Sequence, residues 1–177
     1  ECDCMKSLKD YVLTIPDFPK EGIMFRDITS VLEDADGFAL AIDELKSRLD
    51  GVDFDVIIGA ESRGFVLGAP LAYIFHKPFV LVRKKGKLPR EVVRQEYALE
   101  YGTAELEMNK DSIKKGQKVV IIDDLIATGG TAEAMEKLVE KMGGEVVKAL
   151  FLIELAGFEA RKNLGCPVDT VISYPGK

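Results

Sequence analysis

Short apolar runs, each followed by glycine or by charged residues, alternate along the chain with segments of helical periodicity. The runs at 56–58, 79–82 and 119–122 have the length and composition of strands that are buried on both faces. A further apolar run covers 146–155. Strands buried on both faces are typical of a parallel sheet covered by helices, so the pattern predicts that kind of sheet.

The segments between these runs have the spacing of helices. Apolar residues in 38–49 recur at intervals of three and four, which predicts an amphipathic helix. Residues 63–75 are apolar almost all round, as expected for a helix packed on a sheet. A third helix is expected before the stop signal Gly143-Gly144.

Strand, helix and strand in this order form βαβ units, whose crossovers are right-handed. We therefore predict an α/β fold with a mostly parallel, twisted sheet flanked by helices. No linker or internal repeat divides the chain, so a single domain is expected over 1–177. Residues 103–108 alternate between apolar and acidic positions, which predicts a strand exposed on the side of Glu105 and Glu107.

Composition excludes several classes of function. The chain has 24 Lys and Arg against 30 Asp and Glu, a net charge of −6, which argues against nucleic acid as the main partner. No apolar stretch reaches the ~18 residues of a membrane span, so no membrane association is expected. Three cysteines without framework spacing suit a reducing cytoplasm. The single histidine, His76, is expected at a helix end rather than in catalysis.

The first four residues are unusual because Cys2 and Cys4 precede Met5. The stretch lacks the basic and apolar regions of a secretory signal. We interpret Met5 as the natural start and residues 1–4 as an addition before it. A Cys-x-Cys metal clip is the alternative, although no histidine or second cysteine pair is near in the sequence.

The strongest candidate site follows the run at 119–122. Asp123 and Asp124 come directly after it, and five small or hydroxyl-bearing residues then lead into a helix. Converging backbone N–H groups and a helix N-terminus form a cradle for one phosphate monoester. Carboxylates beside a phosphate can accept hydrogen bonds from vicinal hydroxyls or hold a divalent cation, which describes a site for ribose 5-phosphate. The cradle residues are Ala127, Thr128, Gly129, Gly130 and Thr131.

Residues 83–94 are the electrostatic exception in this acidic chain. They carry six basic residues against Glu91 alone, a net charge of +5. The segment directly follows a predicted buried strand, at the end of the sheet where ligands bind. It is therefore a candidate anion site rather than only a solvated loop. Its basic residues are Arg83, Lys84, Lys85, Lys87, Arg90 and Arg94.

These motifs together resemble a known family. The stretch VVIIDDLIATGGTA, at 119–132, is similar to the phosphoribosyl pyrophosphate (PRPP) signature of the type I phosphoribosyltransferases. Other segments resemble the adenine phosphoribosyltransferases within that family, in the same order along the chain. They are IPDFP at 15–19, GIMFRDI at 22–28, ESRGF at 61–65, VRKKGKLP at 82–89, LEYG at 99–102 and AEL at 104–106.

The resemblance implies a type I phosphoribosyltransferase fold with a small N-terminal hood at about 11–30 and a mobile lid at about 88–102. It implies transfer of the 5-phosphoribosyl group of PRPP to N9 of adenine, giving AMP and pyrophosphate in cytoplasmic purine salvage. It also implies a homodimer. The implied cofactor is Mg²⁺, held mainly by PRPP's own oxygens rather than by a cage of protein ligands.

The resemblance also assigns roles to single residues. Asp123 and Asp124 would hold the ribose hydroxyls, residues 127–131 the 5-phosphate, and Glu100 would move a proton at the N7 side of adenine, with Tyr101 beside it in the lid. Pyrophosphate would be bound at Glu61, Ser62, Arg63, Arg83, Lys84 and Lys87. Adenine would be bound through the backbone of Met24 and Arg26 and between the side chains of Phe25 and Leu125. Many family members have Asp where this chain has Glu61.

Two other functions are also compatible with the sequence. One is a phosphoribosyltransferase for another purine, because the PRPP signature does not identify the base. The other is a PRPP-sensing regulator without catalysis, although the cationic lid and Glu100 favour an enzyme.

Overall fold

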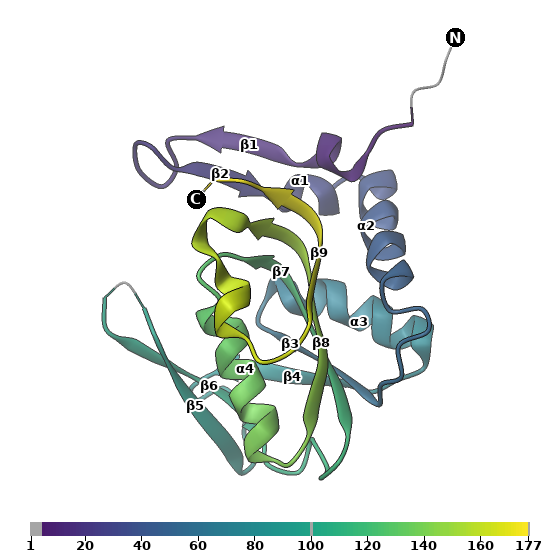
Figure 1. The fold of residues 1–177 in the computed structure, drawn as a ribbon, viewed down its shortest axis with the longest axis vertical. Helices are drawn as coiled ribbons and strands as arrows, with labels where there is room; N and C mark the ends of the chain where they lie inside the picture. The colour runs from purple at the N-terminus through teal and green to yellow at the C-terminus, as the bar shows by residue number, and fades with distance from the viewer. Residues whose placement is uncertain (1–4, 100, 177) are drawn as a thin grey trace.

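The computed structural model describes residues 5–99 and 101–176 (Figure 1). Cys2, Cys4 and Glu100 lie outside the described residues, so neither the metal clip nor the role of Glu100 is tested. The strands of the central sheet are β3 (Val56–Ala60), β4 (Phe79–Lys84), β5 (Val92–Ala98), β6 (Thr103–Asn109), β7 (Lys118–Ile126), β8 (Glu145–Leu155) and β9 (Val168–Tyr174).

The described part of the chain forms a seven-stranded sheet in the order β5-β6-β4-β3-β7-β8-β9. The pairs from β4 through β3, β7 and β8 to β9 are parallel. The strands β5 and β6 are antiparallel to their neighbours at one edge. The predicted α/β class with a mostly parallel sheet is therefore confirmed, and strands are present at 56–58, 79–82, 119–122 and 146–155. The strand β4 is less buried than predicted, because Phe79 and Val80 are half-buried and Leu81 is 40% exposed.

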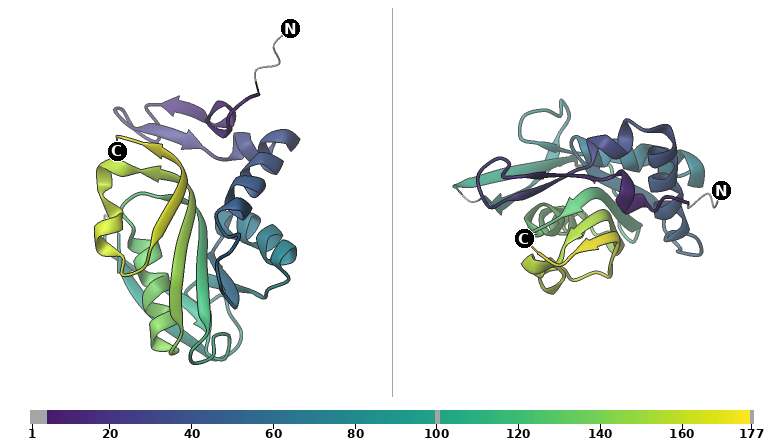
Figure 2. Two further views of the ribbon diagram at one scale, coloured as in Figure 1. Left: turned by 45° about the vertical axis from the view of Figure 1, so that its right-hand side comes forward. Right: turned by 90° about the horizontal axis from the view of Figure 1, so that it is seen from above.

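Helices cover both faces of the sheet (Figures 1 and 2). The helices α2 (Ala35–Ser47) and α3 (Arg63–Phe75) lie on one face, and α4 (Gly130–Lys141) lies on the other. The helix α2 begins earlier than the apolar spacing indicated because the Asp34 carboxylate caps it, accepting hydrogen bonds from the N–H groups of Asp36 and Gly37. As predicted, His76 ends α3.

Two hydrophobic clusters hold these layers together, one on each face of the sheet. Alternate residues of a strand face opposite sides. On β7, Val120 and Ile122 pack in the cluster of α2 and α3, whereas Val119 and Ile121 pack in the cluster of α4. All four side chains are fully buried. The alternation explains why β7 is apolar from Val119 to Ile122, up to the acid pair Asp123 and Asp124.

The N-terminal segment forms the expected hood. The strands β1 (Leu13–Pro16) and β2 (Met24–Asp27) make a separate two-stranded antiparallel sheet, preceded by a 3₁₀ turn at Leu8–Tyr11 and followed by the short helix α1 (Thr29–Leu32). The hood lies beside the C-terminal end of the chain (Figures 1 and 2). The Arg26 guanidinium stacks on the Tyr174 ring at 3.9 Å from its centroid, so a cation–π contact joins β2 to β9.

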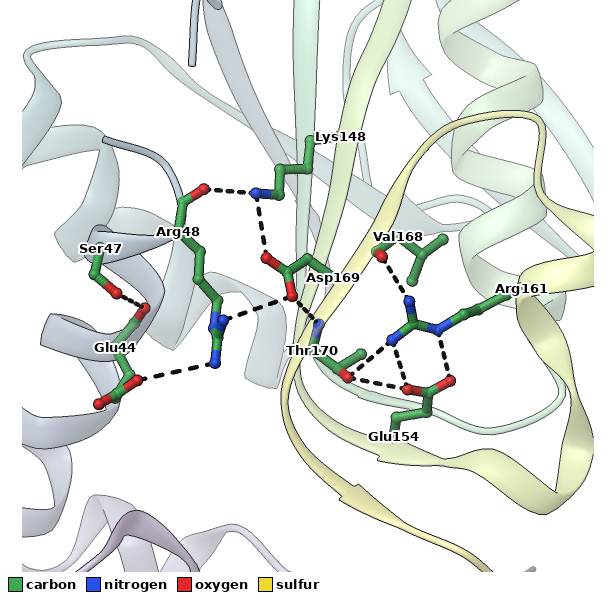
Figure 3. A network of polar contacts seen from close by, with 9 residues as sticks. All are labelled: Glu44, Ser47, Arg48, Lys148, Glu154, Arg161, Val168, Asp169 and Thr170. Carbon is green, nitrogen blue, oxygen red and sulfur yellow. Dashed lines mark hydrogen bonds and ion pairs between the residues drawn. The ribbon is translucent and has the colours of Figure 1, made fainter. Parts of the chain in front are cut away.

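The C-terminal strand is fastened by two groups of polar contacts (Figure 3). Lys148 donates to the carbonyl oxygen of Arg48 at 2.6 Å, and both side chains reach the Asp169 carboxylate. On the other side of β9, Arg161 donates two hydrogen bonds, of 2.9 and 2.8 Å, to the Glu154 carboxylate. These contacts fix the segment between β8 and β9, which includes the 3₁₀ turns Ala156–Phe158 and Ala160–Asn163.

The structure corrects one prediction and refines another. Glu107 was expected on an exposed face, but it is 1% exposed because it lies between its cross-strand neighbours Arg83 and Arg94 and receives hydrogen bonds from Arg94 and Gly86. The segment 88–102, expected as a lid, contains the strand β5, and a hydrogen bond from Leu99 N–H to the Gly102 carbonyl closes the β5–β6 hairpin. No helix in the described residues is long and apolar enough to span a bilayer.

Candidate active site

Three cavities meet where β7 ends, at the edge where parallel strands place their carboxyl termini. An apolar cavity of about 360 Å³ lies between the hood and β8. A polar cavity of about 170 Å³ surrounds the turn after β7, and a second polar cavity of about 550 Å³ lies between β7 and the start of α3. Leu125 lines all three, and Asp123 and Asp124 each line two of them. The two carboxyls therefore stand at the junction.

The side chain of Asp124 faces Arg63, whose Nε lies 2.9 Å from its carboxylate. Asp123 accepts a hydrogen bond of 2.8 Å from the Asp124 N–H. Gly64 makes this arrangement possible, because a Cβ at that position would lie 3.2 Å from an Asp123 oxygen. The first turn of α3 thus approaches the acid pair closely only because it carries a glycine.

The two carboxyls differ in their electrostatic surroundings. Burial raises the pKa of Asp123 well above its ordinary value, and the nearby charge of Asp124 raises it further, while Arg63 acts in the opposite direction. A carboxyl that holds its proton at higher pH can donate a hydrogen bond as well as accept one. Such a group suits a sugar hydroxyl, which itself both donates and accepts.

The turn that was predicted to bind the 5-phosphate lines one cavity. Residues 127–131 all line the cavity of about 170 Å³. Gly129 has φ +87° and forms the N-cap of α4, so the cap is a glycine and not one of the two threonines. The first N–H groups of a helix have no partner within it, and the helix dipole adds partial positive charge at this end. The helix N-terminus therefore gives this cavity N–H donors that have no partner within the helix, together with partial positive charge.

The predicted pyrophosphate residues converge on the larger polar cavity, largely through Glu61. Glu61, Ser62, Arg63 and Lys84 line this cavity. The Glu61 carboxylate accepts a hydrogen bond of 2.7 Å from the Lys84 N–H and pairs with Lys87 Nζ at 2.5 Å and Arg83 Nε at 3.4 Å. Arg83 and Lys87 are thus held beside the cavity by a carboxylate rather than being part of its lining. The Glu61–Ser62 peptide bond is cis.

The apolar cavity contains the predicted base-binding residues. Met24, Phe25, Arg26 and Leu125 all line it. The Arg26 guanidinium is engaged elsewhere, stacked on the Tyr174 ring and donating to the Thr14 hydroxyl at 2.6 Å. The Arg26 guanidinium thus has partners outside the cavity, and the backbone of Arg26 has been predicted as its contact with the base.

Sequence reasoning missed the opposite wall of this cavity. Ile153, Leu155 and Phe158, at and after the end of β8, also line it. The signal was available, because β8 runs parallel to β7 and must end at the same edge of the sheet. Tyr101, in contrast, lies near the tip of the β5–β6 hairpin, is 87% exposed and lines none of the three cavities.

The described residues hold no cluster of three or more His, Cys, Asp or Glu side chains that could bind a metal ion. The carboxyls of Asp123 and Asp124 both line the larger polar cavity. They are hard ligands of the kind that Mg²⁺ accepts, and two carboxyls are as many as a magnesium site shared with a phosphorylated substrate requires.

Comparisons with known proteins agree with this geometry. The model of the phosphoribosyl transferase domain matches residues 29–166. The adenine phosphoribosyltransferase of Agathobacter rectalis is 68% identical over 174 residues, which cover 98% of this chain and 100% of the relative. The adenine phosphoribosyltransferase of Lachnoclostridium phytofermentans is 63% identical, also over 98% of this chain and 100% of the relative.

Solved structures give the same picture. The adenine phosphoribosyltransferase of Thermoanaerobacter pseudethanolicus is 51% identical, with a TM-score of 0.90 over 94% of this chain and 98% of that one. The Saccharomyces cerevisiae enzyme, complexed with D-2,5-dideoxy-2,5-imino-altritol 1,6-bisphosphate and adenine, is 39% identical, with a TM-score of 0.87 over 93% of this chain and 96% of that one.

A parallel sheet that ends in an acid pair, a phosphate cradle and a cationic cavity has the architecture of a type I phosphoribosyltransferase. The domain match and the similar structures place the molecule in that class. Within the class, the chain belongs to the adenine phosphoribosyltransferase family.

Proposed function

We propose that this chain transfers the 5-phosphoribosyl group of PRPP to N9 of adenine, forming AMP and releasing pyrophosphate. The observation that carries the proposal is the meeting of three chemically different cavities around Leu125. An apolar cavity suits a flat base, a small cradle suits one phosphate, and a larger polar cavity bordered by cations suits pyrophosphate. The acid pair stands where the sugar must lie to join all three.

The ribose and its 5-phosphate would be held by the end of β7 and the turn that follows. Backbone N–H groups and hydroxyls of 127–131 bind the phosphate, and Asp123 and Asp124 bind the ribose hydroxyls. Fixing the sugar at both ends orients its C1 atom between the base and the departing pyrophosphate. Orientation of this kind lowers the barrier as well as strengthening binding.

The cations around Glu61 would stabilise the leaving group. As the bond from C1 to pyrophosphate breaks, the sugar gains the character of an oxocarbenium ion and negative charge grows on pyrophosphate. Arg63, Arg83, Lys84 and Lys87 supply positive charge there, together with the backbone at Ser62. Interactions that strengthen as charge develops accelerate the reaction instead of only binding the substrate.

The base would be recognised by the hood. The backbone of Met24 accepts from the 6-amino group and that of Arg26 donates to N1, while Phe25 and Leu125 contact the faces of the ring. A 6-oxo purine would place an acceptor against an acceptor and leave a buried polar group unpaired. By the resemblance of its LEYG segment, Glu100 handles a proton at the N7 side of the base.

Mg²⁺ is the cofactor that we propose, bound mainly through the oxygens of PRPP, with the carboxyls of Asp123 and Asp124 near enough in the same cavity to assist. When bound, it neutralises charge on the leaving pyrophosphate. The protein itself orients the sugar, binds the base and supplies positive charge beside the cavity.

We further propose a homodimer acting in cytoplasmic purine salvage. Val66 and Tyr73 support the dimer: they lie seven residues apart on the same side of α3 and are 39% and 88% exposed. The α3 helix also carries Arg63 at its start, so a partner packed on it would lie near the pyrophosphate cavity.

A base competition assay tests the proposed function. The protein is mixed with PRPP, Mg²⁺ and equal amounts of adenine, hypoxanthine and guanine, and the nucleotide formed is identified. We expect AMP alone. IMP or GMP as the main product would contradict the backbone recognition at the hood but not the transferase reaction. Binding of PRPP without any nucleotide product would point to the regulator.

A further inference from the structure

Glu107 is a buried charged residue outside the predicted site, and it contacts the turn that carries two of the predicted site residues, Lys84 and Lys87. Its carboxylate, 1% exposed on β6, accepts hydrogen bonds from the N–H of Gly86 and from Arg94 Nε, the second at 2.8 Å. Burying a carboxylate is unfavourable unless such partners compensate it. Burial alone would raise the pKa of Glu107, but the hydrogen bonds from Arg94 and Gly86 and the charge of Arg94 lower it. The group is therefore ionised at neutral pH.

Gly86 belongs to the turn that carries Lys84 and Lys87, which we define as the cationic turn, residues 84–87. Two carboxylates hold this turn from neighbouring strands. Glu61, after β3, accepts from the Lys84 N–H at 2.7 Å, and Glu107, on β6, accepts from the Gly86 N–H. Between these two bonds, the turn has one backbone bond to β6, from the Lys85 N–H to the Glu105 carbonyl at 3.2 Å.

Side-chain packing contributes little to fixing this turn. Gly86 has φ +84°, and a Cβ built there would meet no atom within 4 Å, so the turn projects into open space. Lys87 and Lys85 are 45% and 64% exposed. Hydrogen bonds and ion pairs are thus the contacts available to set where the turn lies relative to the polar cavity.

We propose that Glu107 is a positioning residue for the pyrophosphate end of PRPP: by holding the Gly86 N–H, it keeps the cationic turn against the cavity that Lys84 lines. This inference rests on the proposed function, in which Lys84 and Lys87 contact pyrophosphate. Arg94, on β5, completes the arrangement because it occupies the second oxygen of Glu107 and so leaves the first to Gly86. The β5–β6 hairpin and the cationic turn are joined through this one carboxylate.

The proposal distinguishes between three ligands of the same site. Pyrophosphate and PRPP require the cationic turn, whereas AMP binds through the base cavity, the acid pair and the phosphate cradle, without the turn. A change at Glu107 that acts through the turn must therefore weaken the first two and spare the third. A general loss of structure would weaken all three.

The test is Glu107→Gln, with binding of Mg²⁺-pyrophosphate, Mg²⁺-PRPP and AMP measured by calorimetry. We expect the dissociation constants of pyrophosphate and PRPP to rise about tenfold, as for loss of a charged hydrogen-bond acceptor, and that of AMP to change less than about twofold. In turnover, the KM for PRPP rises and the KM for adenine does not. Unchanged pyrophosphate binding, or equal weakening of pyrophosphate and AMP, would overturn the proposal.

Glu136→Gln is the matched control. Glu136, on α4, is also a buried carboxylate that accepts from a glycine N–H, that of Gly165 at 2.9 Å, but the turn it holds lines none of the three cavities. We expect it to leave all three dissociation constants unchanged. If Glu107→Gln fails to fold, Glu107→Asp keeps the charge, withdraws the carboxylate by one methylene group and is subject to the same criteria. Wild-type protein that binds pyrophosphate without making AMP would contradict the proposed function and leave this test valid.

Discussion

Asp123 and Asp124 are proposed to bind the ribose, but the surroundings of Asp123 lower the stability of the fold. Burial and the charge of Asp124 raise the pKa of Asp123 well above 3.8, its ordinary value. Below that value the carboxyl is protonated in both the folded and the unfolded chain, and no penalty arises. As the pH rises toward the folded-state pKa, the unfolded chain ionises first and the free energy of unfolding falls.

Asp123→Asn removes this penalty. We expect its melting temperature to be about 2–4 °C higher near pH 7.5, which corresponds to about 1 kcal/mol, and the gain to vanish near pH 4. Turnover with PRPP and adenine should fall about 100-fold, because the amide cannot replace an oriented carboxyl at the ribose. Thermal unfolding at the two pH values and a steady-state assay measure both effects.

Asp53→Asn is the control for this prediction. Asp53 is exposed, and a hydrogen bond and the charge from Lys118 lower its pKa, so its amide should give no gain in melting temperature. A lower melting temperature of Asp123→Asn near pH 7.5 would show that the carboxyl stabilises the fold and that its pKa is not raised.

Gly129 has a left-handed backbone conformation and also lies in the proposed phosphate cradle. Its φ of +87° is in the left-handed region, and a Cβ there would lie 3.0 Å from that of Ala160. We expect Gly129→Ala to lower the free energy of unfolding by about 2 kcal/mol, from backbone strain and the close contact together. AMP binding should weaken as well, since the cradle shifts. Chemical denaturation and calorimetry provide the two measurements.

Gly116→Ala separates the two causes. Gly116 has nearly the same φ, +85°, but a Cβ there would meet nothing within 4 Å. Its free energy of unfolding should fall by about 1 kcal/mol, from the backbone strain alone, and it should bind AMP like the wild type. Equal losses in the two variants would mean that the contact with Ala160 contributes nothing.

At the scale of elements, the sequence predicted the strands with apolar runs and the alternating strand β6, and it missed β5 and β9. In β5, alternate residues face inward, namely Val93, Gln95 and Tyr97. Because basic residues surround them, the segment was predicted to be a lid and not a strand. The same omission explains the error at Glu107. Arg94 lies on β5 directly opposite Glu107, and without that strand the acidic side of β6 was taken as exposed.

The hood depends on the C-terminal strand for its position. Arg26 presents its backbone to the base cavity while its guanidinium stacks on Tyr174, so the contact across the two elements fixes the backbone. We expect Arg26→Met to raise the KM for adenine about 3–10-fold, as the loss of one cation–π contact allows, and to leave the KM for PRPP unchanged. Steady-state kinetics with each substrate varied in turn measure the split.

Lys9→Met is the matched control, because Lys9 also lies over the Tyr174 ring, at 4.7 Å, but lines none of the three cavities. It should leave both KM values unchanged. Equal increases for adenine and PRPP in Arg26→Met would mean that the contact stabilises the whole molecule rather than positioning the base.

At the scale of the whole molecule, the strand order explains how separate segments form one site. The strands β3, β4, β7 and β8 are parallel neighbours, so the residues that follow them gather at one edge. The motifs and their order along the chain were readable from the sequence. The contacts that position them, such as those of Glu61 and Glu107, were not, because they depend on register between strands far apart in sequence.

The pH dependence of stability tests how these carboxylates act together. Hydrogen bonds from Arg161 lower the pKa of Glu154, and for Glu61 and Glu107 the cations and backbone N–H groups outweigh the effect of burial. A carboxyl with a lowered folded-state pKa stabilises the fold above 4.5, its ordinary value, and that stability is lost as the pH falls through the folded-state value. We expect the wild-type melting temperature to fall as the pH drops below 4.5.

Glu154→Gln isolates one contribution to this acid sensitivity. Glu154 is 8% exposed and ties β8 to the turn before β9 through Arg161 and Thr170 (Figure 3). The variant should lose about 1–3 kcal/mol near pH 7, and the difference from wild type should shrink as the pH falls through the lowered folded-state pKa of Glu154, where the wild-type carboxyl becomes protonated too. In the same segment, Glu159 is 63% exposed in its pair with Lys162, so Glu159→Gln should follow the wild type throughout. A difference between Glu154→Gln and wild type that stayed constant with pH would assign the loss to packing and not to the charge.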